Sequence, residues 1–184
     1  MKAVVVFESM YGNTHAVADR VAAGLRSHFD VVTVPVGQAT PEVLSDADLL
    51  VVGGPTHVHS MSRMSTRKAA AQAVGKAPGL ALEPDATGTG LREWFDLTTP
   101  RAPMAAAFDT RLHGPGALTG RAGKGIARRL RRLGCELVAP PVSFFVNKHE
   151  ALCDGERERA HTWGDAIARL ALARRHHSYP SRAA

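Results

Sequence analysis

The chain has few cysteines, few aromatic side chains and no long hydrophobic run. Its 184 residues include two cysteines, Cys135 and Cys153, and 5% aromatic residues. Two distant cysteines without a Cys-x-x-Cys motif exclude a disulfide-rich scaffold and predict free thiols. A membrane-spanning helix needs about 20 consecutive apolar residues, which the sequence lacks. Since no signal-peptide pattern opens the chain, we expect a cytoplasmic protein without a membrane span.

The two common phosphate-binding motifs of nucleotide-binding proteins are also absent. Neither G-x-G-x-x-G nor G-x-x-x-x-G-K-[ST] follows the first hydrophobic run. Gly123-Lys124-Gly125 lacks the spacing of the second motif, so we do not expect ATP binding. No Lys or Arg lies between Ser9 and Asp19, so an anion bound there would be held by neutral donors.

A buried strand, a tight polar loop and a helix open the chain. The run Val4–Phe7 is typical of a strand buried on both faces of a parallel sheet. Val17, Val21 and Leu25 then recur at intervals of four, which predicts a helix with one buried face. The loop between them lies at the amino end of that helix. Free N–H groups and the helix dipole there favour an anion such as phosphate.

The loop Ser9-Met10-Tyr11-Gly12-Asn13-Thr14 resembles the phosphate-binding signature of the flavodoxin family. In that family the loop binds the phosphate of FMN, so the resemblance implies that these six residues contact FMN. The usual signature has a second small hydroxyl residue where this chain has Tyr11. The alternative is a generic strand–turn–helix of any doubly wound domain, without a ligand.

The rest of the sequence predicts an α/β protein. We expect strands at 4–7, 29–36, 48–53 and 104–108, and a fifth at 135–138 and 142–146 that is broken by Pro140-Pro141. We expect helices at 14–27, from Thr40, and at 66–76, 90–97, 126–133 and 155–174. The resemblance implies a flavodoxin-like, doubly wound, five-stranded parallel sheet of order 2-1-3-4-5 with helices on both faces. We expect one domain over residues 1–175 and a disordered tail at 176–184.

Two further segments complete the predicted cofactor site. The resemblance implies that Pro55, Thr56 and His57 line the flavin ring, and that the segment after the fourth strand forms a third wall. The residues of that third wall are Phe108, Asp109, Thr110 and Arg111. Flavodoxins usually stack an aromatic residue on the flavin, but none stands in the segment 53–63.

Several roles stay open at these positions. The imidazole of His57 or His59, or the ring of Tyr11, could replace the stacking aromatic. A charge on Arg111 near the flavin would stabilise the anion of the reduced cofactor, whereas a solvated surface charge is the alternative. His57 and His59 are also weak candidates for a metal site, because no third ligand accompanies them. We predict no metal site and no catalytic residue.

The net charge is +6, although flavodoxins are typically acidic. A basic surface favours acidic partners or anionic substrates. Four arginines at 128, 129, 131 and 132 lie on the predicted outer face of the helix 126–133. No interleaved aromatics accompany them, so nucleic-acid binding is not expected.

Three functions follow from these patterns. The first is an FMN-binding protein that transfers electrons between redox partners. The second is an FMN-dependent NAD(P)H:quinone-type oxidoreductase, which the long segment 61–90 and the basic charge favour. The third is a flavin-free interaction module, which the unusual Tyr11 and the missing stacking aromatic favour. The oligomeric state and the redox potential do not follow from the sequence.

Overall fold

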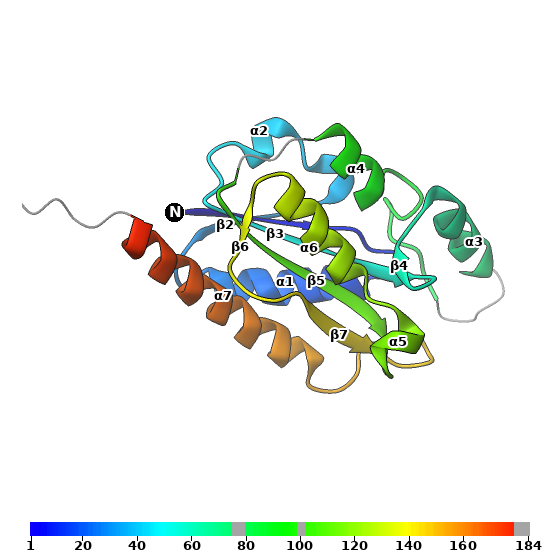
Figure 1. Cartoon of the computed structure of the whole chain (residues 1–184). Helices are drawn as coiled ribbons and strands as arrows, with labels where there is room; N and C mark the ends of the chain where they lie inside the picture. Colours follow the sequence, from blue (N-terminus) through cyan, green and yellow to red (C-terminus); the bar gives the residue numbers. More distant parts are fainter. Residues whose placement is uncertain (75–79, 99–101, 179–184) are drawn as a thin grey trace, which may run out of the picture.

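A computed structural model describes residues 1–74, 80–98 and 102–178 (Figure 1). Its strands are β1 (Lys2–Phe7), β2 (Asp30–Pro35), β3 (Leu49–His57), β4 (Ser60–Met61), β5 (Met104–Leu112), β6 (Glu136–Leu137) and β7 (Val142–Val146). Its helices are α1 (Asn13–Leu25), α2 (Pro41–Leu44), α3 (Met64–Val74), α4 (Leu91–Leu97), α5 (Gly116–Thr119), α6 (Ala122–Arg132) and α7 (Glu156–Ser178). A 3₁₀ turn spans Val36–Gln38.

The strands form one sheet in the order β2-β1-β3-β5-β6, with β7 also paired to β5. The pairings within this order are parallel. The predicted order 2-1-3-4-5 is therefore confirmed. The predicted fifth strand is divided into β6 and β7, with Pro140-Pro141 between them. Proline lacks the N–H that a continuous ladder requires.

The sheet separates two hydrophobic layers, because successive side chains of a strand point to opposite faces. Ala3, Val5 and Phe7 of β1 pack with α1 and α7. Val4 and Val6 pack on the other face with α2, α4 and α6. Figure 1 shows helices on both faces of the sheet, as predicted.

Helices α1 and α7 approach each other closely at two glycines. A Cβ on Gly24 would lie 2.2 Å from the carbonyl oxygen of His161, and one on Gly164 would lie 2.3 Å from that of Val21. Backbone therefore packs directly on backbone at this crossing. The contact joins an early and a late segment of the chain.

Two strands are longer than predicted. β3 continues to His57 and pairs with the short antiparallel β4 through Thr56 and His57. β5 continues to Leu112 because its last residues pair with β7. The segments 55–57 and 109–111, which were expected in loops, therefore belong to strands.

Other expectations differ less or fall outside the described residues. Helix α7 extends to Ser178, so the predicted tail begins inside this helix; residues 179–184 lie outside the described part. The helix predicted over 66–76 begins at Met64, and its last two residues also lie outside. Both cysteines are free, and Cys135 is buried. No helix in the described ranges is long and apolar enough to cross a membrane.

Candidate functional site

The loop after β1 forms a cradle at the start of α1. Gly12 has φ +85°, a left-handed conformation that glycine adopts without steric cost. The Gly12 N–H donates to Ser9 Oγ at 3.1 Å, which closes the turn. Gly12 precedes α1 without a side-chain cap, and the first turn of α1 contains no acidic residue. The helix itself therefore carries no acidic residue at its positive end, but the Glu83 carboxylate lies beside the loop, 3.3 Å from His15 Nδ1.

Thr14 connects this loop to the end of β5. Its Oγ1 lies 2.7 Å from Thr110 Oγ1, and both residues are buried. Either hydroxyl can donate to the other, so one proton of the pair remains for another acceptor. The loop of β1 and the carboxyl end of β5 thus present hydroxyl groups side by side.

A cavity of about 270 Å³ lies at the carboxyl ends of β1, β3 and β5. In a doubly wound sheet, ligands bind outside the strand ends where the strand order reverses, here between β1 and β3. Ten of the thirteen predicted site residues line the cavity: Ser9, Met10, Tyr11, Asn13, Thr14, Pro55, Thr56, His57, Thr110 and Arg111. Sequence reasoning missed five others: Val58, Ala70, Leu112, Val146 and Glu150.

Gly12, Phe108 and Asp109 do not line the cavity. Gly12 shapes the turn, as described above. The Phe108 ring is fully buried and packs edge-on against Phe144. Asp109 Oδ2 accepts a hydrogen bond of 2.6 Å from the N–H of Gly123 in α6. Phe108 and Asp109 therefore lie with the core and with α6, apart from the cavity.

Gly53 and Gly54 make room for core side chains. A Cβ on Gly53 would lie 2.0 Å from Cζ of Phe108, and one on Gly54 would lie 2.6 Å from a methyl carbon of Leu91. Core side chains therefore occupy the space beside both glycines: Phe108 of one hydrophobic layer at Gly53, and Leu91 of the other at Gly54.

Arg111 is buried at one wall of the cavity and braces the segment that follows β5. Its Nη1 donates to the carbonyl of Gly114 at 2.8 Å and to Thr119 Oγ1 at 2.6 Å. Its guanidinium carbon lies 4.7 Å from the centre of the Phe145 ring. The buried Nε makes no hydrogen bond to any described atom. A solvated surface charge, one of the two predicted roles, is therefore wrong.

His57 contributes a neutral ring to the cavity. Burial, and next the charge of Arg67, lower the pKa of the His57 imidazole below its ordinary value of 6.5. Tyr11 adds the other large ring in the lining, and its hydroxyl donates to the carbonyl of Ala70 in α3 at 3.1 Å. His59 is exposed and lines a different cavity. The described residues include no group of three or more His, Cys, Asp or Glu suited to a metal ion.

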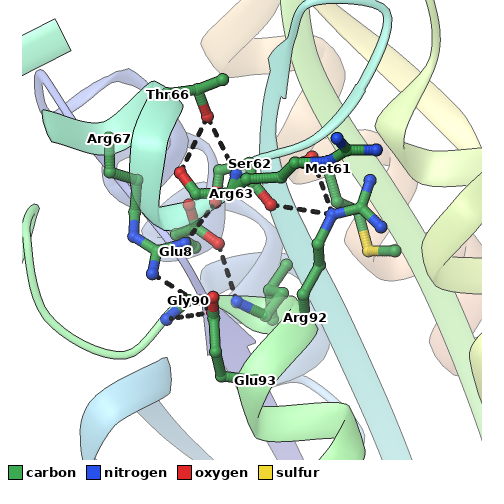
Figure 2. Close-up of polar contacts among 10 residues, drawn as sticks. Glu8, Met61, Ser62, Arg63, Thr66, Arg67, Gly90, Arg92 and Glu93 are labelled. Atoms are coloured by element: carbon green, nitrogen blue, oxygen red, sulfur yellow. Dashed lines mark hydrogen bonds and ion pairs between the residues drawn. The ribbon is translucent and has the colours of Figure 1, made fainter. Parts of the chain in front are cut away.

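Glu8, Ser62, Arg67 and Glu93 form a largely buried polar cluster (Figure 2). The Arg67 side chain is 1% exposed, and its Nη1 donates to Ser62 Oγ at 2.9 Å while its Nη2 lies 3.2 Å from a carboxylate oxygen of Glu93. Glu8 Oε2 accepts the N–H of Leu91 at 2.8 Å. Burial raises the pKa of the Glu8 carboxyl, although hydrogen bonds and Arg67 oppose this effect. The cluster ties α3 and α4 to the end of β1.

The residues of the cavity fit the phosphate end of FMN. The hydroxyls of Ser9 and Thr14 line the cavity, and the uncapped start of α1 adjoins it; a phosphate is bound by donors of this kind. Arg111 also lines the cavity and adds a positive charge to its lining. The volume lies just below the roughly 300–1,000 Å³ typical of ligand pockets.

Comparison with known proteins relates this chain to flavodoxins. Residues 4–67 match the family described as flavodoxin domain. This match includes the loop 9–14 and the segment 55–57, but not Thr110 or Arg111. No curated protein matches the chain.

Solved structures show the same fold. A flavodoxin from the domain Archaea is 21% identical, with a TM-score of 0.65, and the match covers 94% of this chain and 99% of that one. Flavodoxin 1 from Bacillus cereus is 18% identical, with a TM-score of 0.62 and coverage of 92% and 98%. Rubredoxin oxygen:oxidoreductase from Desulfovibrio gigas is 22% identical, with a TM-score of 0.60; the match covers 94% of this chain but 36% of that one. The predicted resemblance and the flavodoxin-like fold are confirmed.

Proposed function

We propose that this flavodoxin-like protein binds FMN in the cavity at the carboxyl ends of β1, β3 and β5 and transfers electrons between redox partners. The observation that carries the proposal is the loop Ser9–Thr14, which leads into an uncapped helix with no acidic residue in its first turn. This combination attracts an anion and is found beside the cavity where the sheet order reverses.

The residues divide between the two ends of the cofactor. At the phosphate end, we assign Ser9, Thr14 and the backbone N–H groups of the loop as donors. At the ring end, we assign Pro55, Thr56 and His57 from β3, Tyr11 from the loop and Arg111 from β5. FMN, when bound, supplies one- and two-electron redox chemistry.

The electrostatics of the ring end follow from burial. His57 is held neutral near pH 7 because its pKa is lowered, so it can accept or donate one hydrogen bond without adding charge. Arg67 and Arg111 both carry fixed positive charge here; Arg111 lines the cavity and is held by three acceptors: Leu112, Gly114 and Thr119. A buried cation at this wall stabilises negative charge that develops in the cavity.

A reductase is the second candidate. Tyr11 and His57 supply the rings in the lining, and the described lining residues include neither Phe nor Trp. An open flavin face would admit a nicotinamide or a quinone, so an NAD(P)H:quinone-type activity remains a proposal. We also propose that residues 1–175 act as a single domain and that the protein is cytoplasmic.

A titration of the purified protein with FMN tests the proposal. We expect quenching of flavin fluorescence to saturate at one FMN per chain, and the bound flavin to remain after desalting. Riboflavin is the matched control, because it lacks the phosphate that the loop is assigned to bind. No saturable binding would refute the FMN site and favour the interaction-module function.

The same sample separates the two redox functions. Addition of NADPH without a partner protein would bleach the flavin absorbance of a reductase. An electron carrier would keep its absorbance until a reduced partner protein is added.

A further inference from the structure

A groove of about 620 Å³ lies beside the FMN cavity, along the first turns of α6. Arg121, Lys124 and Arg128 line it, together with His59 and Ser60. We call the three cationic residues the basic rim. Their side chains are exposed, and within the described ranges none of them forms an ion pair; the ion pair of α6 joins Arg129 to Asp96. The described residues that line the groove include no Asp or Glu.

Three exposed apolar side chains belong to segments that adjoin the cavity and the groove. Val58 is 78% exposed, Leu112 is 48% exposed and Leu118 is 72% exposed. Val58 and Leu112 line the FMN cavity. Leu118 stands two residues before Gly120. Gly120 forms a β-bridge with His59 and lines the groove. We call these three residues the apolar centre.

The hairpin of β3 and β4 lies between the cavity and the groove, and hydrogen bonds fix it on both sides. Arg92 of α4 donates from Nε to the carbonyls of Met61 and Ser62 at 3.1 and 2.9 Å (Figure 2), and from Nη2 to Ser60 Oγ at 3.0 Å. On the other side, the Arg121 N–H donates to the His59 carbonyl at 3.3 Å. Binding to a preformed surface loses less conformational entropy than binding to a mobile one.

The segment 110–135 contains basic residues but no acidic ones, and it includes the basic rim. Arg63 and Arg92 line a further cavity formed with residues of the hairpin, and its described lining contains no Asp or Glu either. The positive potential therefore extends across the hairpin.

We propose that the basic rim and the apolar centre dock an acidic redox protein, with its protruding acidic segment in the groove. An apolar centre surrounded by charge is the usual anatomy of a protein–protein interface. Opposite charge steers the encounter, which suits a transient complex. A concave groove favours a protein protrusion over a flat membrane surface. The redox character of the partner rests on the proposed function, because it follows from the adjacent FMN cavity.

Binding to a plant-type ferredoxin, a small acidic iron–sulfur protein, tests the proposal. We expect measurable binding of the full chain by titration calorimetry at low salt, and progressive weakening as salt is added. The triple variant R121E/K124E/R128E should bind at least about tenfold more weakly. The matched control, R26E/R131E/R132E, changes the net charge equally at exposed positions outside the groove and should bind within about twofold of the native chain. Circular dichroism and thermal melting verify that both variants fold.

Each result has one meaning. Equal loss of binding in both variants would show non-specific charge attraction and overturn the proposal, as would the absence of salt-sensitive binding. Binding to vesicles with anionic lipid but not to ferredoxin would overturn it in favour of a membrane surface. The measurement is repeated without FMN, so a failed FMN titration would refute the proposed function without affecting this result.

Discussion

Ser9 and Thr14 are the residues on which the FMN site depends most directly. Ser9 Oγ accepts the Gly12 N–H, and Thr14 Oγ1 pairs with Thr110. We expect Ser9→Ala and Thr14→Ala each to weaken FMN binding by roughly 1–3 kcal/mol, because each removes a hydrogen bond to a charged group. Fluorescence titration measures the change.

The control for these substitutions is Ser27→Ala, which removes an exposed hydroxyl just beyond α1. Its FMN affinity should equal that of the native chain. Unchanged affinity in the Ser9 and Thr14 variants would show that the phosphate binds elsewhere.

His57 should make the free energy of unfolding depend on pH, and the sign of this dependence follows from its lowered pKa. Burial lowers the pKa of its imidazole in the folded state, so the unfolded chain binds more protons between that lowered pKa and about 6.5. The free energy of unfolding contributed by this group therefore rises with pH through this window, by at most about 1.4 kcal/mol per pH unit.

Urea unfolding between about pH 5 and pH 8 measures this slope. His57→Gln should reduce it, because glutamine does not titrate. The same slope in both proteins would mean that the His57 imidazole is equally easy to protonate in the folded and unfolded states.

At the scale of elements, the crossing of α1 and α7 depends on glycine. Gly24→Ala should destabilise the protein by about 1–3 kcal/mol, although alanine favours helix, because the added Cβ meets the backbone of His161. Thermal or urea unfolding measures the loss.

Gly125 provides a control with a smaller expected effect. A Cβ there would meet only the end of the Met61 side chain, at 3.3 Å, and alanine favours helix by about 0.5–1 kcal/mol, so Gly125→Ala in α6 should cost much less than Gly24→Ala. Equal effects of the two substitutions would contradict backbone contact as the cause.

The sequence predicts the elements well where periodicity is strong. Val4–Phe7 and the spacing of Val17, Val21 and Leu25 predicted β1 and α1, and the structure confirms both. The end of β3 was missed because Gly53-Gly54-Pro55 is typical of a turn, and the end of β5 was missed because its partner β7 comes from a distant segment of the chain. Pairing of Pro55 with Thr110 and of Thr56 with Met61 overrides that local preference.

The candidate site was predictable where its residues are adjacent in sequence. The loop 9–14 is a local motif, whereas the burial of Arg67 depends on Glu93 and Ser62, which come from two other segments. No local pattern distinguishes Arg67 from a surface arginine of an amphipathic helix. Phe108 was assigned to the site from the resemblance alone, whereas its ring packs in the core against Phe144.

At the scale of the whole molecule, FMN should stabilise the fold. A ligand at 100 times its dissociation constant adds about 2.7 kcal/mol to the free energy of unfolding. For a domain of this size, that corresponds to a rise in Tm of about 5–10 °C. Scanning calorimetry with FMN measures it, and riboflavin should give a smaller rise. Equal rises would mean that the loop Ser9–Thr14 does not bind the phosphate.

The close packing of α1 on α7 has a consequence for vectorial synthesis. The ribosome completes every strand of the sheet before it makes α7, whose residues Ala160 and Ile167 belong to the same core layer as Val5 and Val21. During translation, α1 and the strands therefore expose apolar surface on this face of the sheet. A nascent chain at this stage is a substrate for chaperones, and its native fold is completed only after α7 has emerged.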